Sequence, residues 1–234
     1  MKLKMLKAAL AGLVLSVTSI ANAGLIDLSS WTATSGGTWN VDAGNTSVYQ
    51  TTNGNPTFFL SDTNYINTQF DGTFGVTPGW DDDYIGFVFG YNNSNDYLLF
   101  DWKQADQGAA NSGFTLSRIT GSNVNLWDHT GADISVLASN YTGNNGWVDG
   151  VTYNFTLDFT TTSISIDMDN ANIFDIAGTF NTGKFGFYNY SQAGVRYTGF
   201  EETVSPSIDV PEPSTLAIFA LGIMGLASRR FKKQ

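Results

Sequence analysis

The 234-residue chain contains no cysteine, a single histidine, and 11 basic residues against 21 acidic ones. Without cysteine, neither a disulfide framework nor a thiolate metal site can form, and one histidine argues against a zinc centre. Most of the basic residues lie at the two ends, so residues 24–205 keep four basic side chains against nineteen acidic ones. A segment this acidic is a poor partner for nucleic acid or an anionic membrane, and a good one for cations.

Long apolar runs and helical periodicity are also missing between residues 24 and 205. The two apolar runs of the chain lie near its ends and are shorter than the roughly 20 residues of a stable membrane span. We find neither a phosphate-binding loop nor a dinucleotide fingerprint. These absences argue against nucleotide-dependent chemistry and a permanent helical anchor.

A basic start, an apolar segment and a small-residue pattern follow one another in residues 1–23. This order is typical of a secretory signal, and Ala21-x-Ala23 has the form of a signal peptidase cleavage site. We therefore expect signal peptidase to remove residues 1–23 and the mature chain to begin at Gly24.

The other end combines Pro211-Glu212-Pro213 with an apolar run and a basic cluster. This three-part tail resembles the PEP-CTERM sorting signal of Gram-negative bacteria. The resemblance implies a linker with the motif over 205–213, and an apolar helix with a basic tail over 214–234. It further implies a transient inner-membrane anchor that an exosortase-type membrane protease cleaves, delivering the protein to the cell surface or extracellular matrix.

Alternating apolar and polar residues, separated by turns rich in Asn and Gly, fill residues 24–204. This pattern predicts short strands with one buried face, in a single domain of an all-β, antiparallel two-sheet sandwich or barrel. Residues 84–91 differ, because both faces are apolar or glycine, and we expect a central strand covered on both sides. The predicted strands are 46–51, 66–75, 84–91, 96–104, 114–120, 123–128, 151–159, 163–169, 173–176, 184–190 and 195–203.

Three segments, FDGTFGV (70–76), DDDYIGFVFGY (81–91) and FDWKQADQ (100–107), together resemble the C-terminal lectin-like domain of thrombospondins. Further segments in the same order extend the resemblance over about residues 66–200. It implies a jelly-roll sandwich related to concanavalin A and other lectins, with an extracellular, calcium-dependent role in adhesion. The family's calcium-binding repeats and cysteines are absent here, so receptor binding by animal thrombospondins is not carried over.

Asp81, Asp82 and Asp83 are consecutive carboxylates, which repel one another unless a cation or protons intervene. Calcium takes six to eight oxygen ligands and suits such a group. If the strand begins this early, alternation places Asp81 and Asp83 on one side and Asp82 on the other, so Asp101 on the next strand is expected to help. A solvated start of a strand is the alternative interpretation.

Several aromatic residues lie near predicted strand ends, where a ring can stack on a sugar while carboxylates and amides bind its hydroxyls. Trp102, Trp127 and Tyr91 are the candidate ligand-binding residues, although packing at the edge of the core is the favoured interpretation for any single one of them. The expected partner is a polysaccharide or a neighbouring surface protein.

A glycoside hydrolase on the same fold is the remaining alternative, and it needs two facing carboxylates. The only glutamates of residues 24–205, Glu201 and Glu202, are adjacent and point to opposite faces of a strand. His129 is expected to be a loop residue without a triad role. We therefore predict a non-enzymatic, exported, calcium-binding adhesion or matrix-binding domain, with a carbohydrate-binding module as the alternative.

Overall fold

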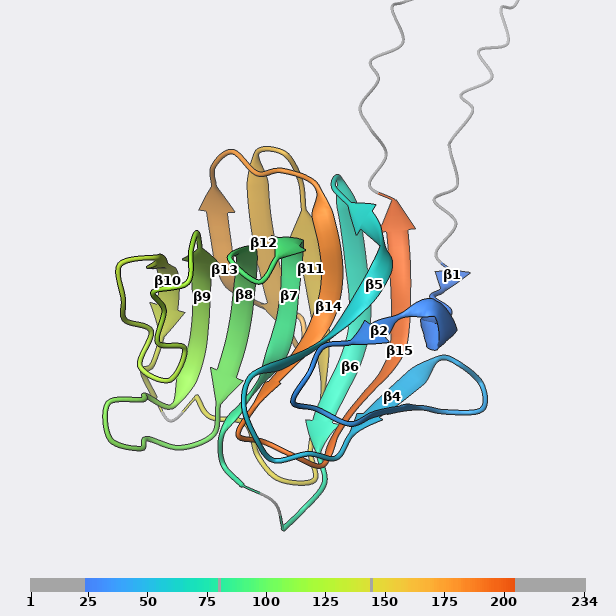
Figure 1. The fold of residues 1–234 in the computed structure, drawn as a ribbon, viewed down its shortest axis with the longest axis horizontal. Helices are drawn as coiled ribbons and strands as arrows, with labels where there is room; N and C mark the ends of the chain where they lie inside the picture. Colours follow the sequence, from blue (N-terminus) through green and yellow to red (C-terminus); the bar gives the residue numbers. More distant parts are fainter. Residues whose placement is uncertain (1–23, 80, 144, 205–234) are drawn as a thin grey trace, which may run out of the picture.

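The computed structural model describes residues 24–79, 81–143 and 145–204. They form two antiparallel sheets that lie face to face (Figure 1). The eight-stranded sheet has the order β13-β12-β11-β6-β15-β4-β3, with β1 added on β15, and the seven-stranded sheet has the order β10-β9-β8-β7-β14-β5-β2. A single turn of 3-10 helix, η1 (Leu28–Ser30), precedes β2.

The eight-stranded sheet consists of β1 (Gly24–Leu25), β3 (Trp39–Val41), β4 (Ser47–Gln50), β6 (Thr68–Val76), β11 (Thr152–Phe159), β12 (Ser163–Met168), β13 (Ala171–Ala177) and β15 (Val195–Val204). The seven-stranded sheet consists of β2 (Thr32–Ala33), β5 (Thr57–Tyr65), β7 (Tyr84–Asn93), β8 (Asp96–Lys103), β9 (Gly113–Ile119), β10 (Ile134–Asn140) and β14 (Gly183–Tyr190).

Strict alternation produces the expected half-buried strands in the eight-stranded sheet. In β11, Phe155, Leu157 and Phe159 are buried, while Thr156 and Asp158 between them are less so. Because side chains of a strand point alternately to its two faces, one face of β11 contributes to the core between the sheets and the other faces outward. The core is rich in stacked aromatic rings, such as Phe70 and Phe185 with centroids 4.4 Å apart.

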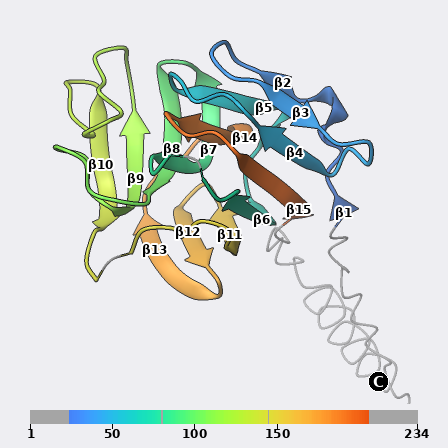
Figure 2. The same cartoon turned by 90° about the horizontal axis from the view of Figure 1, so that it is seen from below.

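The seven-stranded sheet is buried on both faces. In β7, Ile85, Phe87 and Phe89 belong to the core between the sheets, whereas Tyr84 and Val88 belong to a second cluster. The loop between β9 and β10 contributes Leu126 to this second cluster and lies on the outer side of the sheet (Figure 2). The prediction of a central strand at 84–91, covered on both sides, is therefore confirmed.

The all-β, two-sheet jelly-roll sandwich is confirmed, and ten of the predicted strands correspond to observed ones within a few residues. The predicted strand at 123–128 is wrong: this segment is a loop, closed by an isolated bridge between Asn125 and Thr130. Two long strands, β5 and β10, were not predicted, nor were the short strands β1, β2 and β3.

The predicted signal peptide 1–23 with its cleavage residues Ala21 and Ala23, the linker, the motif Pro211-Glu212-Pro213 and the helix of 214–234 lie outside the described residues. Within the described residues, no helix has the length and apolar character needed to cross a membrane.

Candidate metal centre

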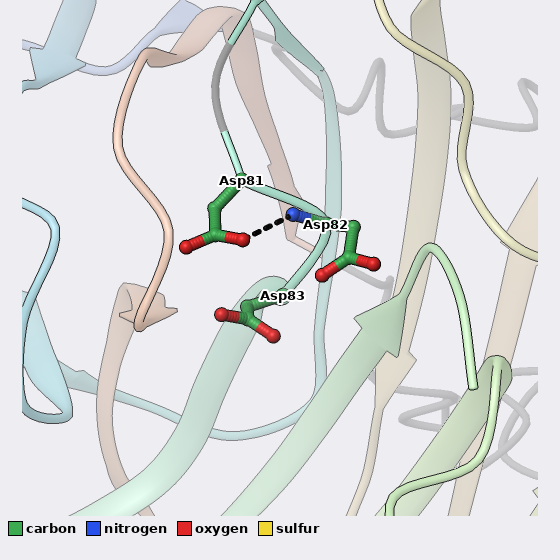
Figure 3. A group of neighbouring side chains, drawn as sticks. All are labelled: Asp81, Asp82 and Asp83. Atoms are coloured by element: carbon green, nitrogen blue, oxygen red, sulfur yellow. Dashed lines mark hydrogen bonds between the residues drawn. The ribbon is translucent and has the colours of Figure 1, made fainter. Parts of the chain in front are cut away.

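Asp81, Asp82 and Asp83 lie in the loop that leads into β7, at one end of the seven-stranded sheet (Figure 3). Each contributes a carboxylate oxygen to a group whose members all lie within 4.8 Å of one another. The strand begins only at Tyr84, so the alternation considered for these three residues does not apply, and the bent loop brings all three carboxylates together.

Hydrogen bonds hold the cluster in place. One oxygen of Asp81 accepts from Asn53 Nδ2 at 2.9 Å, and the other accepts from the backbone N–H of Asp82 at 3.1 Å. The backbone of Asp83 is fixed twice: its N–H donates to Gln192 Oε1 at 2.9 Å, and its carbonyl accepts from Trp147 Nε1 at 3.0 Å. The loop that carries the carboxylates is therefore held by residues from three distant parts of the chain.

Lys103, on β8, supplies the positive charge next to the cluster. Its ammonium lies 2.6 Å from Asp83 Oδ1 and 3.9 Å from Asp82 Oδ1, and its side chain is fully buried. The same ammonium donates to Gln107 Oε1 at 3.3 Å and lies 4.7 Å from the centre of the Trp127 ring. Three carboxylates and one ammonium leave a net charge of −2 if all are ionised.

The geometry of the cluster fits calcium. Calcium–oxygen distances are about 2.3–2.6 Å, so two oxygens on opposite sides of one ion are separated by up to roughly 5 Å. The oxygens of the three aspartates satisfy this limit. All the candidate ligands are oxygen atoms, as hard cations require, and the remaining charge of −2 matches a divalent ion. Carboxylate and carbonyl oxygens, with water, would complete the ligand shell.

Asp101, the fourth predicted ligand, does not join this cluster. Its side chain is fully buried under the β9–β10 loop, where Oδ2 lies 2.8 Å from His129 Nε2. The register pairs Tyr84 with Lys103 and Gly86 with Asp101, so Lys103 is the β8 residue opposite the start of β7. Counting back from the pair of Asn93 and Asp96 would place Asp101 opposite Val88, farther from the aspartates. The register shift between Phe89 and Asn93 moves Asp101 to Gly86 and brings Lys103 opposite Tyr84.

The pair of Asp101 and His129 is electrostatically coupled. Burial raises the pKa of Asp101, and the nearby imidazole partly opposes this shift. Burial disfavours the charged form of His129, but the carboxylate of Asp101 outweighs it and raises the pKa of the imidazole. His129 is therefore a buried anchor of the loop, a role that its sequence neighbours do not indicate.

The three predicted ligand-binding aromatic residues occupy different environments. Trp102 is only 4% exposed and packs between the sheets against Phe114, with ring centroids 4.5 Å apart, so its ring is not accessible to a ligand. Tyr91 is partly exposed and packs against Phe58. Trp127 is partly exposed, and its ring lies beside the ammonium of Lys103, the same group that lies next to the aspartate cluster.

A second aromatic residue, Tyr190, lies beside Trp127. Their ring centroids are 5.6 Å apart and nearly perpendicular, and both side chains are partly exposed. Tyr190 was not predicted, because it is 63 positions away from Trp127 in the sequence and its strand, β14, pairs with β7 only in the folded sheet. The two rings are here called the Trp127–Tyr190 surface. The ammonium of Lys103, which pairs with Asp83, lies 4.7 Å from the centre of the Trp127 ring and places this surface near the aspartate cluster.

Comparisons with known proteins agree with this architecture. The family described as Thrombospondin C-terminal region matches residues 34–204, and the PEP-CTERM protein-sorting motif matches residues 209–233. Thrombospondin-4 of Bos taurus is 34% identical over 128 residues, which are 47% of this chain and 13% of that protein. Cartilage oligomeric matrix protein of Rattus norvegicus is 40% identical over 60 residues, 26% of this chain and 8% of that protein.

Two solved structures share the fold at low sequence identity. A carbohydrate binding module from Bacillus subtilis (CBM66) has a TM-score of 0.57 and 13% identity, covering 74% of this chain and 95% of its own. A Bacillus subtilis protein with a galectin-like fold has a TM-score of 0.53 and 10% identity, covering 75% and 90%. The sorting motif and the family match together indicate an exported, cell-surface or extracellular protein. Because the family match spans most of the chain, the protein belongs to the thrombospondin C-terminal region family.

Proposed function

We propose that this protein is a calcium-binding, non-enzymatic adhesion or matrix-binding domain. The observation that carries the proposal is the convergence of Asp81, Asp82 and Asp83, whose ligand oxygens all lie within 4.8 Å of one another. The curated relatives are matched over a small part of their length, so their partners are not transferred as such.

Calcium would act mainly by stabilising the loop before β7. Asp81 is exposed and Asp82 partly exposed, so an ion could enter from solvent, whereas Asp83 is 2% exposed and is held by Lys103. Without a cation the exposed carboxylates repel one another across a short distance. A ligand that binds the native state adds stability in proportion to the logarithm of its concentration above Kd.

Thermal unfolding in calcium and in EDTA tests the ion. We expect the melting temperature to rise by several degrees in millimolar calcium, and the rise to vanish in Asp81→Asn and Asp82→Asn. Asp149→Asn is the matched control, because Asp149 is an exposed acid outside the cluster. Identical melting curves in calcium and in EDTA would exclude a calcium centre here.

Carbohydrate is the second candidate ligand, and the Trp127–Tyr190 surface is the observation that favours it. Partly exposed rings next to carboxylates and amides are how proteins hold sugars. The shared fold with a carbohydrate binding module is consistent with this role. A glycan array of the purified protein, with and without calcium, should show binding that Trp127→Ala removes; an array without any signal would leave adhesion to protein partners as the remaining proposal.

A hydrolase is less well supported by the described carboxylates. Asp101 is fully buried and therefore inaccessible to a substrate. Asp71 and Glu201 line a hollow of about 350 Å³. Both carboxylate oxygens of Asp71 already accept hydrogen bonds, one from Gln69 and one from Thr156. We propose no catalytic residue. Release of reducing sugar from a polysaccharide panel by the wild type, lost in Asp71→Asn, would contradict this view.

Processing by signal peptidase and an exosortase-type protease also remains a proposal. The sorting motif matches residues 209–233, directly after the folded domain. Mass spectrometry of the protein recovered from the cell surface or medium should give a chain that begins at Gly24 and lacks the basic tail. Recovery of the intact C-terminus outside the cell would rule out cleavage of the tail.

A further inference from the structure

Three buried polar atoms lie on the outer face of the seven-stranded sheet without a hydrogen-bond partner among the described residues. They are Asp101 Oδ1, Ser117 Oγ and Tyr188 OH. All three side chains are fully buried. Buried polar atoms in native proteins are nearly always paired with protein groups or with ordered water. Thr115, opposite Asp101 on β9, also acts on the Asp101 carboxyl group and opposes the rise in its pKa. The atoms that lack any protein partner are therefore Ser117 Oγ and Tyr188 OH, and they call for an explanation.

The sheet register places these atoms in one neighbourhood. Tyr188 pairs with Gly86, and Gly86 pairs with Asp101, so the two polar side chains flank a glycine that contributes no side chain between them. Ser117 pairs with Leu99, two positions before Asp101, and is therefore diagonal to Asp101 on the adjacent strand. A substituent at Gly86 would meet the carbonyl oxygen of Phe100 at 2.1 Å, so glycine is required there.

The β9–β10 loop encloses this neighbourhood from outside. Its His129 bonds to Asp101 Oδ2 at 2.8 Å, and its Trp127 carbonyl accepts from Tyr84 OH at 2.6 Å. The apolar Leu126 of the same loop packs into the second cluster. The polar atoms therefore lie on the part of the sheet that this loop covers, between the sheet on one side and the loop on the other.

We propose that ordered water molecules occupy this space and bind Asp101 Oδ1, Ser117 Oγ and Tyr188 OH. Water both donates and accepts hydrogen bonds, so it satisfies a carboxylate and two hydroxyls at once, and internal waters typically have two to four polar partners. A calcium ion needs six to eight oxygens, more than these three atoms supply, and a protonated His129 would repel it. The bound water joins the side chains of β8, β9 and β14 on the outer face of the sheet, independently of the aspartate cluster.

Removing single hydroxyls tests this proposal by the sign of its effect. If water binds Tyr188 OH and Ser117 Oγ, Tyr188→Phe and Ser117→Ala each lose a satisfied hydrogen bond, and we expect the melting temperature to fall by a few degrees. If the atoms are unpaired in a dry space, deleting them removes a desolvation penalty, and the melting temperature stays constant or rises. Tyr190→Phe, on the same strand at a partly exposed position, is the control for loss of a phenol hydroxyl.

A crystal structure of the protein supplies the second test. We expect water density within hydrogen-bonding distance of Asp101 Oδ1, Ser117 Oγ and Tyr188 OH. Melting temperatures should also be compared in sodium, potassium and choline chloride at equal ionic strength. We expect the change of melting temperature from one cation to another to be small, and to be the same in wild type and in Tyr188→Phe. The absence of water at these atoms in the crystal, an unchanged or raised melting temperature on deleting the hydroxyls, or a cation-specific shift lost in the variant would each overturn the proposal.

Discussion

The two faces of the seven-stranded sheet are both buried, but by different chemistry. The inner face contributes rings and aliphatic side chains such as Ile85 and Phe87 to a core without charges. The outer face carries Asp101 and Lys103 on one strand, both fully buried, and each with a partner from elsewhere in the chain. The stability of the inner face depends on packing. The stability of the outer face depends on charged pairs, in which loss of one partner leaves the other buried without a counter-charge.

Loss of the buried ammonium of Lys103 should cause the largest decrease in the free energy of unfolding. Lys103→Met keeps most of the side-chain volume but leaves Asp83 buried without its counter-ion. Breaking one partner of a buried pair costs about 3–5 kcal/mol, so we expect the free energy of unfolding to fall by roughly that amount in urea denaturation with EDTA present.

Lys184→Met is the matched control, because Lys184 is partly exposed on β14 of the same sheet and no shift of more than about 1 kcal/mol is expected for such a lysine. A second variant, Asp83→Asn combined with Lys103→Met, should recover part of the loss, since it no longer buries an unpaired charge. Equal stability of Lys103→Met and wild type would mean that Asp83 finds another partner.

The inner face was largely predictable from the sequence, because alternation reports burial against one partner surface. Where both faces are buried, the same signal fails. β5 places Phe58 in the outer cluster and Phe59 in the core, so its apolar residues are consecutive and no alternation marks it. β10 was missed for the opposite reason, since most of its side chains are exposed at the edge of the sheet.

The segment 123–128 shows the limit of the pattern most clearly. Its alternation is genuine, because Leu126 is buried in the second cluster and Val124 packs against it, yet the segment is a loop. Periodicity therefore recorded which side chains face the protein and not whether the backbone joins a sheet. The aspartate cluster was predictable because its three residues are adjacent in the sequence. The position of Lys103 depends on a register shift, and the contact of His129 with Asp101 depends on the path of a loop, and the sequence displays neither.

Breaking the contact between Asp101 and His129 should lower stability by an intermediate amount, and this amount should depend on pH. The pKa of His129 is raised above its usual value near 6.5 in the folded protein, so the folded state holds the proton more tightly than the unfolded one. The stabilisation is complete below about pH 6.5 and disappears as the pH rises through the raised pKa. We expect wild-type stability to decline over this range relative to His129→Gln.

Because the chain has a single histidine, no other imidazole titrates between pH 6 and 9, and the difference between the two melting curves reports His129 together with its coupled partner Asp101. Loss of a hydrogen bond to a charged partner typically costs about 1.5–3 kcal/mol, and His129→Gln should lose an amount of this order at pH 6. Asp133→Asn, in the same loop but without contact to His129 in the described hydrogen bonds, controls for changes of loop charge. A pH-independent difference would assign His129 a packing role alone.

A conservative change on the inner face should have the smallest effect. Ile85→Val removes one methylene group from a fully buried position between the sheets, and such substitutions cost about 0.5–1.5 kcal/mol. The loss should be the same at pH 6 and pH 9, and the same in calcium and in EDTA. The reason is that Ile85 belongs to the inner core cluster, which consists of apolar side chains. If Ile85→Val changed the response to pH or calcium, packing on the inner face would control the polar network of the outer face through β7, and the separation of the two faces would not hold.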